Sequence, residues 1–343
     1  MNILRILFLI VVMAGTLFFM HRFGINEVWI RLARIELNAN IANREDDFIK
    51  WMEFNIPLDM LKLAYNYDIN SQNSQTPHNW IELLAYTAAK NWGNFNEKSG
   101  QIMSDVVKRL ENGELMYDIS RDLRLYNYYL EIFSAVLASF VGLYEIVHIN
   151  DEGEEIRELR YGLRTFFPIA AGYYYEHYDD FGNPRTYGYK RRHLGHDIFG
   201  EVGIPIIAVE DGIIEALGWN RYGGWRIGIR SFDGRRYYYY AHLRRDRPFA
   251  EGLEIGMQVQ AGDVIGYLGK TGYSTRENVN NINVPHLHFG LQIIFDESQK
   301  DSGNEIWIDT YNIIRFLKQN RMIVVKGEDG EFRRGVEVNF YVE

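Results

Sequence analysis

Cysteine is absent from the 343-residue sequence. The chain therefore has no disulfide bond, no thiol nucleophile and no thiolate metal site, so a bound transition metal would need histidine and carboxylate ligands. A basic excess is absent as well, because 37 Lys and Arg stand against 46 Asp and Glu and give a formal net charge of -9. This charge argues against a nucleic-acid partner. The nine histidines become the first candidates for chemistry.

Low-complexity tracts and internal repeats at solenoid spacing are also missing. Hydrophobic residues make up 47% of the chain, which excludes a largely disordered protein. The length leaves room for about two domains. We therefore expect a folded, multidomain protein whose parts differ in composition and periodicity.

The longest apolar run covers residues 6–20. With its flanks it reaches roughly 20 residues, the length of one membrane span. A cleaved signal peptide would begin in the same way, but residues 17–20 are Leu-Phe-Phe-Met and offer no small-x-small cleavage site. We expect residues 1–25 to form an uncleaved signal anchor that crosses the cell membrane once. The positive-inside rule does not orient it, because basic residues occur on both sides.

The next part of the chain has helical periodicity. Pro57 and Pro77 lie at first-turn positions, and Thr76 is placed as an N-cap. We expect an all-α middle domain over residues 26–148.

An apolar stretch closes this helical part at residues 132–144. It is too short to span a bilayer and indicates a buried core helix. Residues 149–160 are acidic and contain glycine, and we expect them to form a linker.

After the linker the sequence changes to short β-branched and aromatic runs separated by turn signals. Asp211-Gly212 and Asp233-Gly234 each lie between two such runs, which is a strong signal for a β-hairpin. We expect an all-β, antiparallel, barrel-like domain over residues 161–300. Helical spacing then returns, so residues 301–343 should add a small C-terminal helix and a closing hairpin.

Histidines are concentrated in this β part. The six that lie in it or just before it are His177, His193, His196, His242, His286 and His288. His286 and His288 are two apart in a strand pattern, so both imidazoles point to the same face of a sheet. One could bind a metal while the other moves a proton to or from a metal-bound water. The spacing leaves open which of the two is the ligand.

His193 and Asp197 offer an imidazole and a carboxylate four residues apart. With one histidine of the pair they make three ligands and leave the fourth tetrahedral position to water, which is the open arrangement of a catalytic zinc site. Magnesium and calcium prefer oxygen ligands, so this set predicts zinc. His242 ends an aromatic strand and would face the same site if that strand lay beside the strand of the pair.

Five motifs extend this pattern between about residues 187 and 295: HLGHD, GIPIIAVEDG, YAHL, QVQAGDVIGYLGKTGYST and PHLHFGLQ. Together they resemble the lysostaphin and LytM-type zinc metallopeptidases, the peptidoglycan endopeptidases of bacterial cell walls. The resemblance implies a LytM-type fold with one Zn²⁺ per chain, bound by His193, Asp197 and His288. It also implies that His242 and His286 are the catalytic histidines beside the metal.

Three details near the site go beyond these motifs. Tyr187 and Tyr189 lie where this family's peptidases place a tyrosine near the metal, and either could donate a hydrogen bond to the developing oxyanion. Residues 276–284 replace the usual short connection and could form one wall of the substrate groove. His196 precedes Asp197 without matching a family ligand, so we expect it on the surface or in support of the metal site.

The helical part has no comparable signal. Glu82 could be interpreted as the general acid of a muramidase-like enzyme, but no second, suitably placed carboxylate is evident. We interpret this part as a spacer, a cover for the peptidase groove or a binding module for an envelope protein.

A basic cluster follows the strand signals: Arg235, Arg236, Arg244, Arg245 and Arg247. It could meet carboxylates of stem peptides or acidic wall polymers, whereas a solvated hairpin face is the simpler interpretation.

The patterns together predict a zinc-dependent metalloendopeptidase that hydrolyses stem peptides or cross-bridges of peptidoglycan. The expected location is the cell membrane, with the catalytic domain extracytoplasmic. The rival prediction is a non-catalytic LytM-like envelope scaffold or an activator of another cell-wall hydrolase. The intact histidines and Asp197 argue against that rival.

Overall fold

The computed structural model describes residues 48–149, 152–187, 189–300 and 302–340. The predicted anchor, residues 1–25, lies outside these ranges. Within them, no helix combines the length and the apolar character that a membrane span requires. The prediction of a single-pass membrane location is therefore wrong on this finding.

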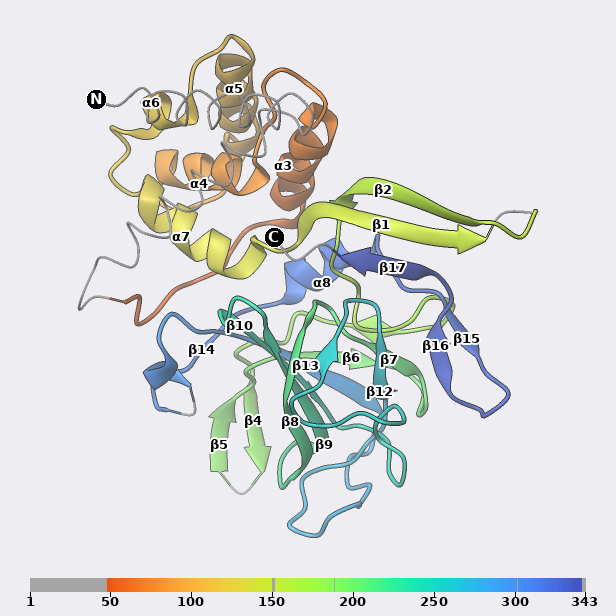
Figure 1. The fold of residues 1–343 in the computed structure, drawn as a ribbon. Helices are drawn as coiled ribbons and strands as arrows, with labels where there is room; N and C mark the ends of the chain where they lie inside the picture. The colour runs from red at the N-terminus through yellow and green to blue at the C-terminus, as the bar shows by residue number, and fades with distance from the viewer. Residues whose placement is uncertain (1–47, 150–151, 188, 301, 341–343) are drawn as a thin grey trace, which may run out of the picture. The chain divides into compact units, whose positions relative to one another are not determined.

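Five helices precede the strands in the described part of the chain: α3 (Leu58–Ser71), α4 (Trp80–Lys90), α5 (Ser99–Glu111), α6 (Met116–Ser120) and α7 (Tyr126–Leu137) (Figure 1). Helix α4 is mostly buried and packs against α7. Asn79 caps α4, because its side-chain oxygen accepts hydrogen bonds from the backbone N–H groups of Ile81 at 2.9 Å and Glu82 at 3.2 Å. Thr76 is therefore not the cap, and the helix begins later than its pattern indicated.

The core helix expected over residues 132–144 is shorter in the structure. Helix α7 ends at Leu137, and strand β1 (Val141–Ile149) follows. Strand β1 pairs with β2 (Glu155–Leu163) and with β17 (Glu337–Phe340) from the other end of the chain. Much of the expected linker therefore belongs to a sheet. A short apolar run is compatible with a helix or a strand. Here pairing with β17, from the far end of the chain, favours a strand after Leu137.

An eight-stranded antiparallel sheet forms the main part of the β region (Figure 1). Its path is β11 (Gln258–Val259), β8 (Gly212–Asn220), β9 (Gly224–Ser231), β10 (Arg236–Ala241), β13 (His286–Ile293), β6 (His196–Phe199) and β3 (Glu176–His177), and β14 (Ile306–Trp307) also pairs with β13. Among the described strands the two ends of this path do not pair, so the expected barrel is not closed. Both end strands have two residues, too few to complete the continuous ladder that closure needs.

The two hairpin predictions have different outcomes. Strands β9 and β10 form the hairpin around Asp233-Gly234, where Gly234 has a φ of +73°. Asp211-Gly212 is not a hairpin turn, because β7 (Pro205–Ile207) pairs with β12 (Val264–Tyr267) and β8 pairs with β9. At Gly212 a Cβ atom would lie 2.3 Å from the carbonyl oxygen of Arg230. The glycine therefore permits close approach of β9 to β8.

A second short hairpin, β4 (Pro184–Tyr187) with β5 (Tyr189–Arg192), precedes β6. The expected C-terminal helix and hairpin are α8 (Tyr311–Leu317) and the pair β15 (Val324–Lys326) with β16 (Phe332–Arg334), and a single 3-10 turn, η1 (Glu297–Gln299), lies before them.

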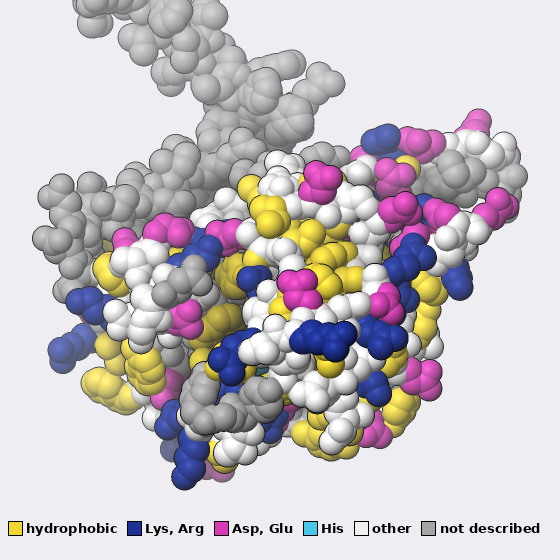
Figure 2. Space-filling view, turned by 90° about the horizontal axis from the view of Figure 1, so that it is seen from below, with side chains coloured by type: hydrophobic (Ala, Val, Ile, Leu, Met, Phe, Trp, Pro, Cys, Tyr) yellow, Lys and Arg dark blue, Asp and Glu magenta, His cyan; other side chains and the backbone are white. Residues whose placement is uncertain are grey.

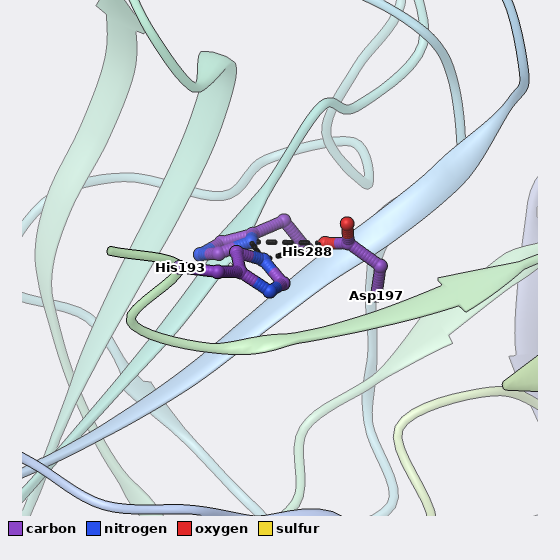
Figure 3. Close-up of side chains that lie close together, drawn as sticks. All are labelled: His193, Asp197 and His288. Carbon is purple, nitrogen blue, oxygen red and sulfur yellow. Dashed lines mark hydrogen bonds and ion pairs between the residues drawn. The ribbon is translucent and has the colours of Figure 1, made fainter. Parts of the chain in front are cut away.

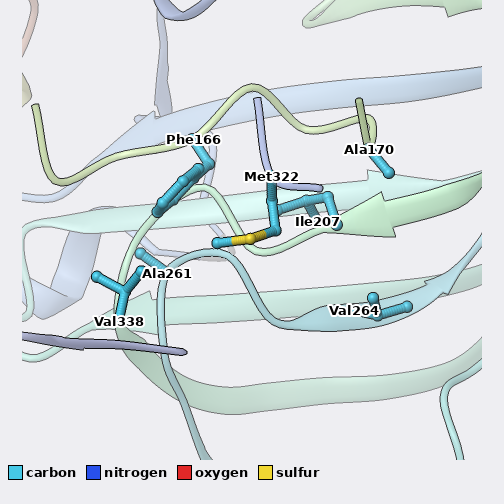
Figure 4. Packing of buried hydrophobic residues seen from close by; sticks show 7 residues of the cluster. All are labelled: Phe166, Ala170, Ile207, Ala261, Val264, Met322 and Val338. Carbon is cyan, nitrogen blue, oxygen red and sulfur yellow. The ribbon is translucent and has the colours of Figure 1, made fainter. Parts of the chain in front are cut away.

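The C-terminal segment is part of the β core. A buried cluster joins residues that precede β3, residues of β7, of β12 and of the turn before β12, and residues of the C-terminal segment (Figure 4). Its members are Phe166, Ala170, Ile207, Ala261, Val264, Met322 and Val338. The hydrophobic core therefore includes residues on both sides of residue 300, where the β domain was expected to end.

Candidate metal centre

Strand β13 carries two of the candidate histidines between two neighbouring strands. His288 pairs with Asp197 of β6 on one side and with Ala241 of β10 on the other. Leu287 and Phe289 are buried in the core. Because side chains alternate along a strand, His286 and His288 share the other face, as their spacing indicated.

His193, Asp197 and His288 converge on one point (Figure 3). His193 Nε2 lies 2.9 Å from His288 Nδ1 and 3.0 Å from Asp197 Oδ1. His288 Nδ1 lies 3.1 Å from the same oxygen. Donor atoms in a tetrahedral zinc shell are about 3.3 Å apart when each bond is about 2.0 Å. The two nitrogens and one oxygen therefore fit a zinc ion and leave its fourth position open.

The electrostatics of the three side chains favour a positive charge between them. Burial opposes a charge on His193, but hydrogen bonds with Asp180 and Asp197 raise the pKa of its imidazole to about 9. Burial also opposes ionisation of Asp197, yet His193 and His288 hold the pKa of this carboxyl well below its ordinary value. Burial lowers the pKa of His288. A metal dication and a proton on His193 would thus compete for the same negative site.

His242 and His286 flank the three converging side chains. The ring centroid of His242 lies 4.8 Å from that of His286 and 5.8 Å from that of His288. His286 Nε2 lies 3.7 Å from Asp197 Oδ1. All five predicted side chains are therefore within one site.

Backbone carbonyls orient the two flanking imidazoles. Nδ1–H of His242 donates to the carbonyl oxygen of Thr271 at 2.9 Å, and Nδ1–H of His286 donates to that of Val284 at 2.8 Å. In this tautomer Nε2 of each ring is a hydrogen-bond acceptor. Burial, together with His286 and His288, holds the pKa of His242 well below its ordinary value, so His242 is neutral near pH 7. Its φ of +64° is strained for a residue with a side chain, which is a feature typical of functional sites.

Two residues near the site escaped the sequence analysis. Arg185 Nη2 donates to Asp180 Oδ2 at 2.8 Å and to Asp197 Oδ2 at 3.0 Å. Asp180 Oδ2 in turn lies 3.2 Å from His193 Nδ1. The turn-forming sequence DDFGNPR was their one local signal, and it did not reveal which side chain they would contact.

The remaining candidates lie in different surroundings. Tyr187 and Tyr189 pair with each other at the ends of β4 and β5, and their side chains lie outside the described residues. His196 is fully buried, so a surface position is wrong. Its Nε2 lies 2.8 Å from His177 Nδ1, and as the neighbour of Asp197 in β6 it points to the opposite face of the sheet.

Tyr273, another residue that the sequence analysis did not single out, lies beside His242. Their ring centroids are 5.7 Å apart. The guanidinium of Arg191 lies over the rings of Tyr222 and Tyr273, at 5.1 and 5.2 Å, and its Nη2 donates to the Tyr273 hydroxyl at 2.8 Å. An aromatic and cationic wall therefore adjoins the histidines.

The insertion at residues 276–284 is fastened to the sheet. The side-chain oxygen of Asn278 accepts hydrogen bonds from Trp225 Nε1 at 2.9 Å and from the backbone N–H of Asp246 at 2.8 Å. The insertion also ends at Val284, whose carbonyl orients His286.

The basic cluster divides in the structure. Arg236 is buried and pairs with Glu210 and Asp233, whereas Arg235 lies elsewhere, over the ring of Phe295. Arg244, Arg245 and Arg247 line a pocket of about 370 Å³. Lys and Arg side chains also gather on the face of the molecule seen from below (Figure 2).

Comparisons with known proteins agree with this arrangement. Residues 191–309 match the sequence model of peptidase family M23. The chain is 32% identical over 216 residues to an L-Ala–D-Glu endopeptidase of Bacillus subtilis (strain 168), over 62% of this chain and 60% of that protein. It is 41% identical over 98 residues to the glycyl-glycine endopeptidase ALE-1 of Staphylococcus capitis, over 28% and 24% of the two chains. The chain thus spans less than two thirds of either relative.

A crystal structure of a LytM protein from Ruminococcus gnavus ATCC 29149 is similar with a TM-score of 0.54 and 23% identity, over 84% of this chain and 97% of that one. At this identity the likeness concerns the fold alone. The resemblance to the lysostaphin and LytM-type peptidases, expected from the motifs, is confirmed by the family match and the relatives.

Proposed function

Residues 191–309 form a peptidase family M23 domain, and from that premise we propose that the chain is a zinc-dependent metalloendopeptidase that hydrolyses peptide bonds of bacterial peptidoglycan. The observation that carries the proposal is the set of three donor atoms, His193 Nε2, Asp197 Oδ1 and His288 Nδ1, which lie 2.9–3.1 Å from one another. Two further imidazoles adjoin that set. A structural zinc site would not need them.

The chemistry divides between the metal and the two flanking histidines. His193, Asp197 and His288 would hold the zinc ion, which would supply polarisation of the scissile carbonyl and a coordinated water with a pKa lowered to about 7. His286 Nε2 lies 3.7 Å from Asp197 Oδ1, and its role in this proposal is to accept the proton of the attacking water. His242, neutral and held by Thr271, adjoins His286, so its unprotonated Nε2 can take up the proton removed from the water and deliver it to the leaving amine.

The relatives indicate which bond to test first. One is named as an L-Ala–D-Glu endopeptidase and another as a glycyl-glycine endopeptidase. The first similarity extends over 216 residues and therefore beyond the peptidase domain, whereas the second covers 98 residues. We therefore propose a stem peptide as the substrate and the L-Ala–D-Glu bond as the first candidate.

Zinc content and hydrolysis of purified peptidoglycan test the proposal together. The protein should hold one zinc per chain and release new amino groups, and a chelator should stop the release. His288→Ala should lose both zinc and activity, because it removes a ligand. His286→Ala should keep zinc and lose activity. Asp179→Asn, an exposed neighbour of the site, is the control and should change neither.

Two results would contradict this assignment. Equal loss of zinc from His286→Ala and His288→Ala would remove the distinction between ligand and proton carrier. Stoichiometric zinc without hydrolysis of peptidoglycan would favour the rival scaffold function.

A further inference from the structure

The segment from Asp180 to Arg185 wraps around His193. The backbone N–H of Gly182 donates to the carbonyl oxygen of His193 at 2.7 Å, and the N–H of His193 donates to that of Asn183 at 2.9 Å. Both backbone groups of His193 are therefore bound by the same turn. This turn places the Asp180 and Arg185 side chains against the metal-binding residues.

Asp180 contacts the imidazole nitrogen of His193 that faces away from the other two donors. His193 Nδ1 lies 3.2 Å from Asp180 Oδ2 and 3.1 Å from the Asp180 carbonyl oxygen. Arg185 Nη2 lies 3.2 Å from the same nitrogen, but its two hydrogens are donated to Asp180 Oδ2 and Asp197 Oδ2. The two acceptors therefore favour a hydrogen on Nδ1, which leaves the lone pair of Nε2 directed toward Asp197 and His288. The required tautomer is thus selected by Asp180.

Asp180 is itself held on both of its oxygens. Arg185 Nη2 donates to Oδ2 at 2.8 Å. On the other side, the backbone N–H of Asp197 lies 3.4 Å from Oδ1, and Nδ1 of the fully buried His196 lies 3.5 Å from it. Asp180 is buried, with 9% of its surface exposed. Rotation of the carboxylate away from His193 would break the hydrogen bonds with Arg185 and with the backbone N–H of Asp197.

Arg185 connects the two carboxylates of the site. Its Nη2 lies between Asp180 Oδ2 and Asp197 Oδ2, at 2.8 and 3.0 Å. Without a cation between them, two buried carboxylates so close together would raise the pKa of one another. The guanidinium also occupies the oxygen of Asp197 that is not among the three donors, so the other oxygen remains directed toward them.

We propose that Asp180 is a positioning residue of the metal centre, which fixes the orientation and tautomer of His193. Arg185 in turn fixes the positions of the Asp180 and Asp197 carboxylates relative to each other. This inference rests on the proposed zinc site. It extends the site to a segment that precedes residue 191, where the family match begins. An ordinary surface ion pair would explain the contact between Arg185 and Asp180. It would not explain why Asp180 also contacts the His193 imidazole or why Arg185 also contacts Asp197.

The test is the zinc affinity of the full chain, measured by competition with a chromophoric chelator. Asp180→Asn keeps the shape of the side chain but loses the charge, and we expect a 10–100-fold weaker affinity. Asp179→Asn changes the adjacent, exposed carboxylate and should leave the affinity unchanged. Thermal unfolding of the zinc-free variants should match the unsubstituted protein, which separates positioning from folding.

Cobalt(II) spectra supply a readout that a purely structural role would not change. Asp180→Asn should alter the visible d–d bands of the cobalt-substituted protein, whereas Asp179→Asn should not, because only Asp180 contacts a ligand imidazole. Asp180→Glu, which retains the charge, should recover part of the lost zinc affinity.

A double substitution tests the role of Arg185. If Arg185 acts through Asp180, then Arg185→Gln should weaken zinc binding less in the Asp180→Asn background than in the unsubstituted protein. Full additivity would overturn the role of Arg185, and equal zinc affinities of Asp180→Asn and Asp179→Asn would overturn the role of Asp180. Absence of zinc from the unsubstituted protein would instead overturn the proposed function, and this inference with it.

Discussion

The β region and the helical region treat ionisable side chains differently. Around β6, β10 and β13, buried side chains of opposite charge lie together, as Arg236 does with Glu210. Glu82 of helix α4 has no ion-pair partner within the described residues. The first arrangement keeps charges ionised by pairing them. The second shifts the pKa of the isolated group, and burial raises the pKa of Glu82 to about 7. The carboxylate of Asp197 therefore stays ionised through its partners, whereas the charge of Glu82 changes with pH near neutrality.

The difference also bears on function. A raised pKa would suit a general acid, but a glycoside hydrolase needs two carboxyl groups across its bond. Burial alone accounts for the shift of Glu82. The β region instead combines a carboxylate with several imidazoles, a set that can bind a metal and move protons.

The largest expected effect compares one buried histidine from each region. His242→Gln should lower the rate of peptidoglycan hydrolysis by about 10²–10⁴-fold, because a proton carrier is lost. His78→Gln, also at a buried histidine, should leave the rate per folded molecule unchanged. Release of amino groups under identical conditions measures both. Similar losses in the two variants would remove the functional distinction between the regions.

A buried arginine gives the next largest effect. Arg236 is 1% exposed, pairs with Glu210 Oε2 at 2.8 Å and donates to the carbonyl oxygen of Ala135 at 2.8 Å. Arg236→Met should destabilise the protein by about 3–5 kcal/mol, because Glu210 would remain buried without its partner. Urea unfolding measures the change. Arg235→Met is the neighbouring control and should stay within about 0.5 kcal/mol.

Glu82 should make stability depend on pH in a defined direction. Its folded pKa of about 7 lies above the ordinary value of 4.5, so the folded state binds more protons between these values. This contribution is full below pH 4.5 and is lost as the pH rises through 7. Glu82→Gln should therefore be more stable than the unsubstituted protein at pH 8, by about 1–3 kcal/mol, and nearly equal to it at pH 4.

Unfolding curves at the two pH values test this prediction, with the exposed Glu97→Gln as control. A stability difference that did not change with pH would mean that Glu82 is ionised at both values.

The smallest effect concerns a helix end. Asn79→Ala removes the oxygen that accepts hydrogen bonds from the first turn of α4 and should cost about 1 kcal/mol. Asn94→Ala, at an exposed position outside the helices, should stay within about 0.5 kcal/mol. Thermal unfolding of the two variants distinguishes them. Equal stabilities would mean that water replaces the cap at no cost.

Much of the site could be predicted from the sequence because its signals are local. A spacing of two in a strand implies one face for His286 and His288, and Asp233-Gly234 predicts its hairpin. The role of Asp180 could not be predicted, because its contact with the His193 imidazole depends on the turn at residues 180–185, which is hydrogen-bonded to the His193 backbone. Helix α7 and β1 were misjudged for a similar reason, since the partner of β1 that lies in β17 comes from the far end of the chain.

The sequence by itself determined the donor types: no thiolate, an imidazole and a carboxylate four residues apart, and two histidines on one face of a strand. These follow from residue chemistry and from the pleat of the backbone, which act over a few residues. Only the tertiary structure decided which nitrogen of each ring faces the other donors, that Arg185 bridges two carboxylates, and that the sheet stays open. Those features depend on strand pairing and side-chain packing between segments that are distant in the chain, and periodicity carries no information about such contacts.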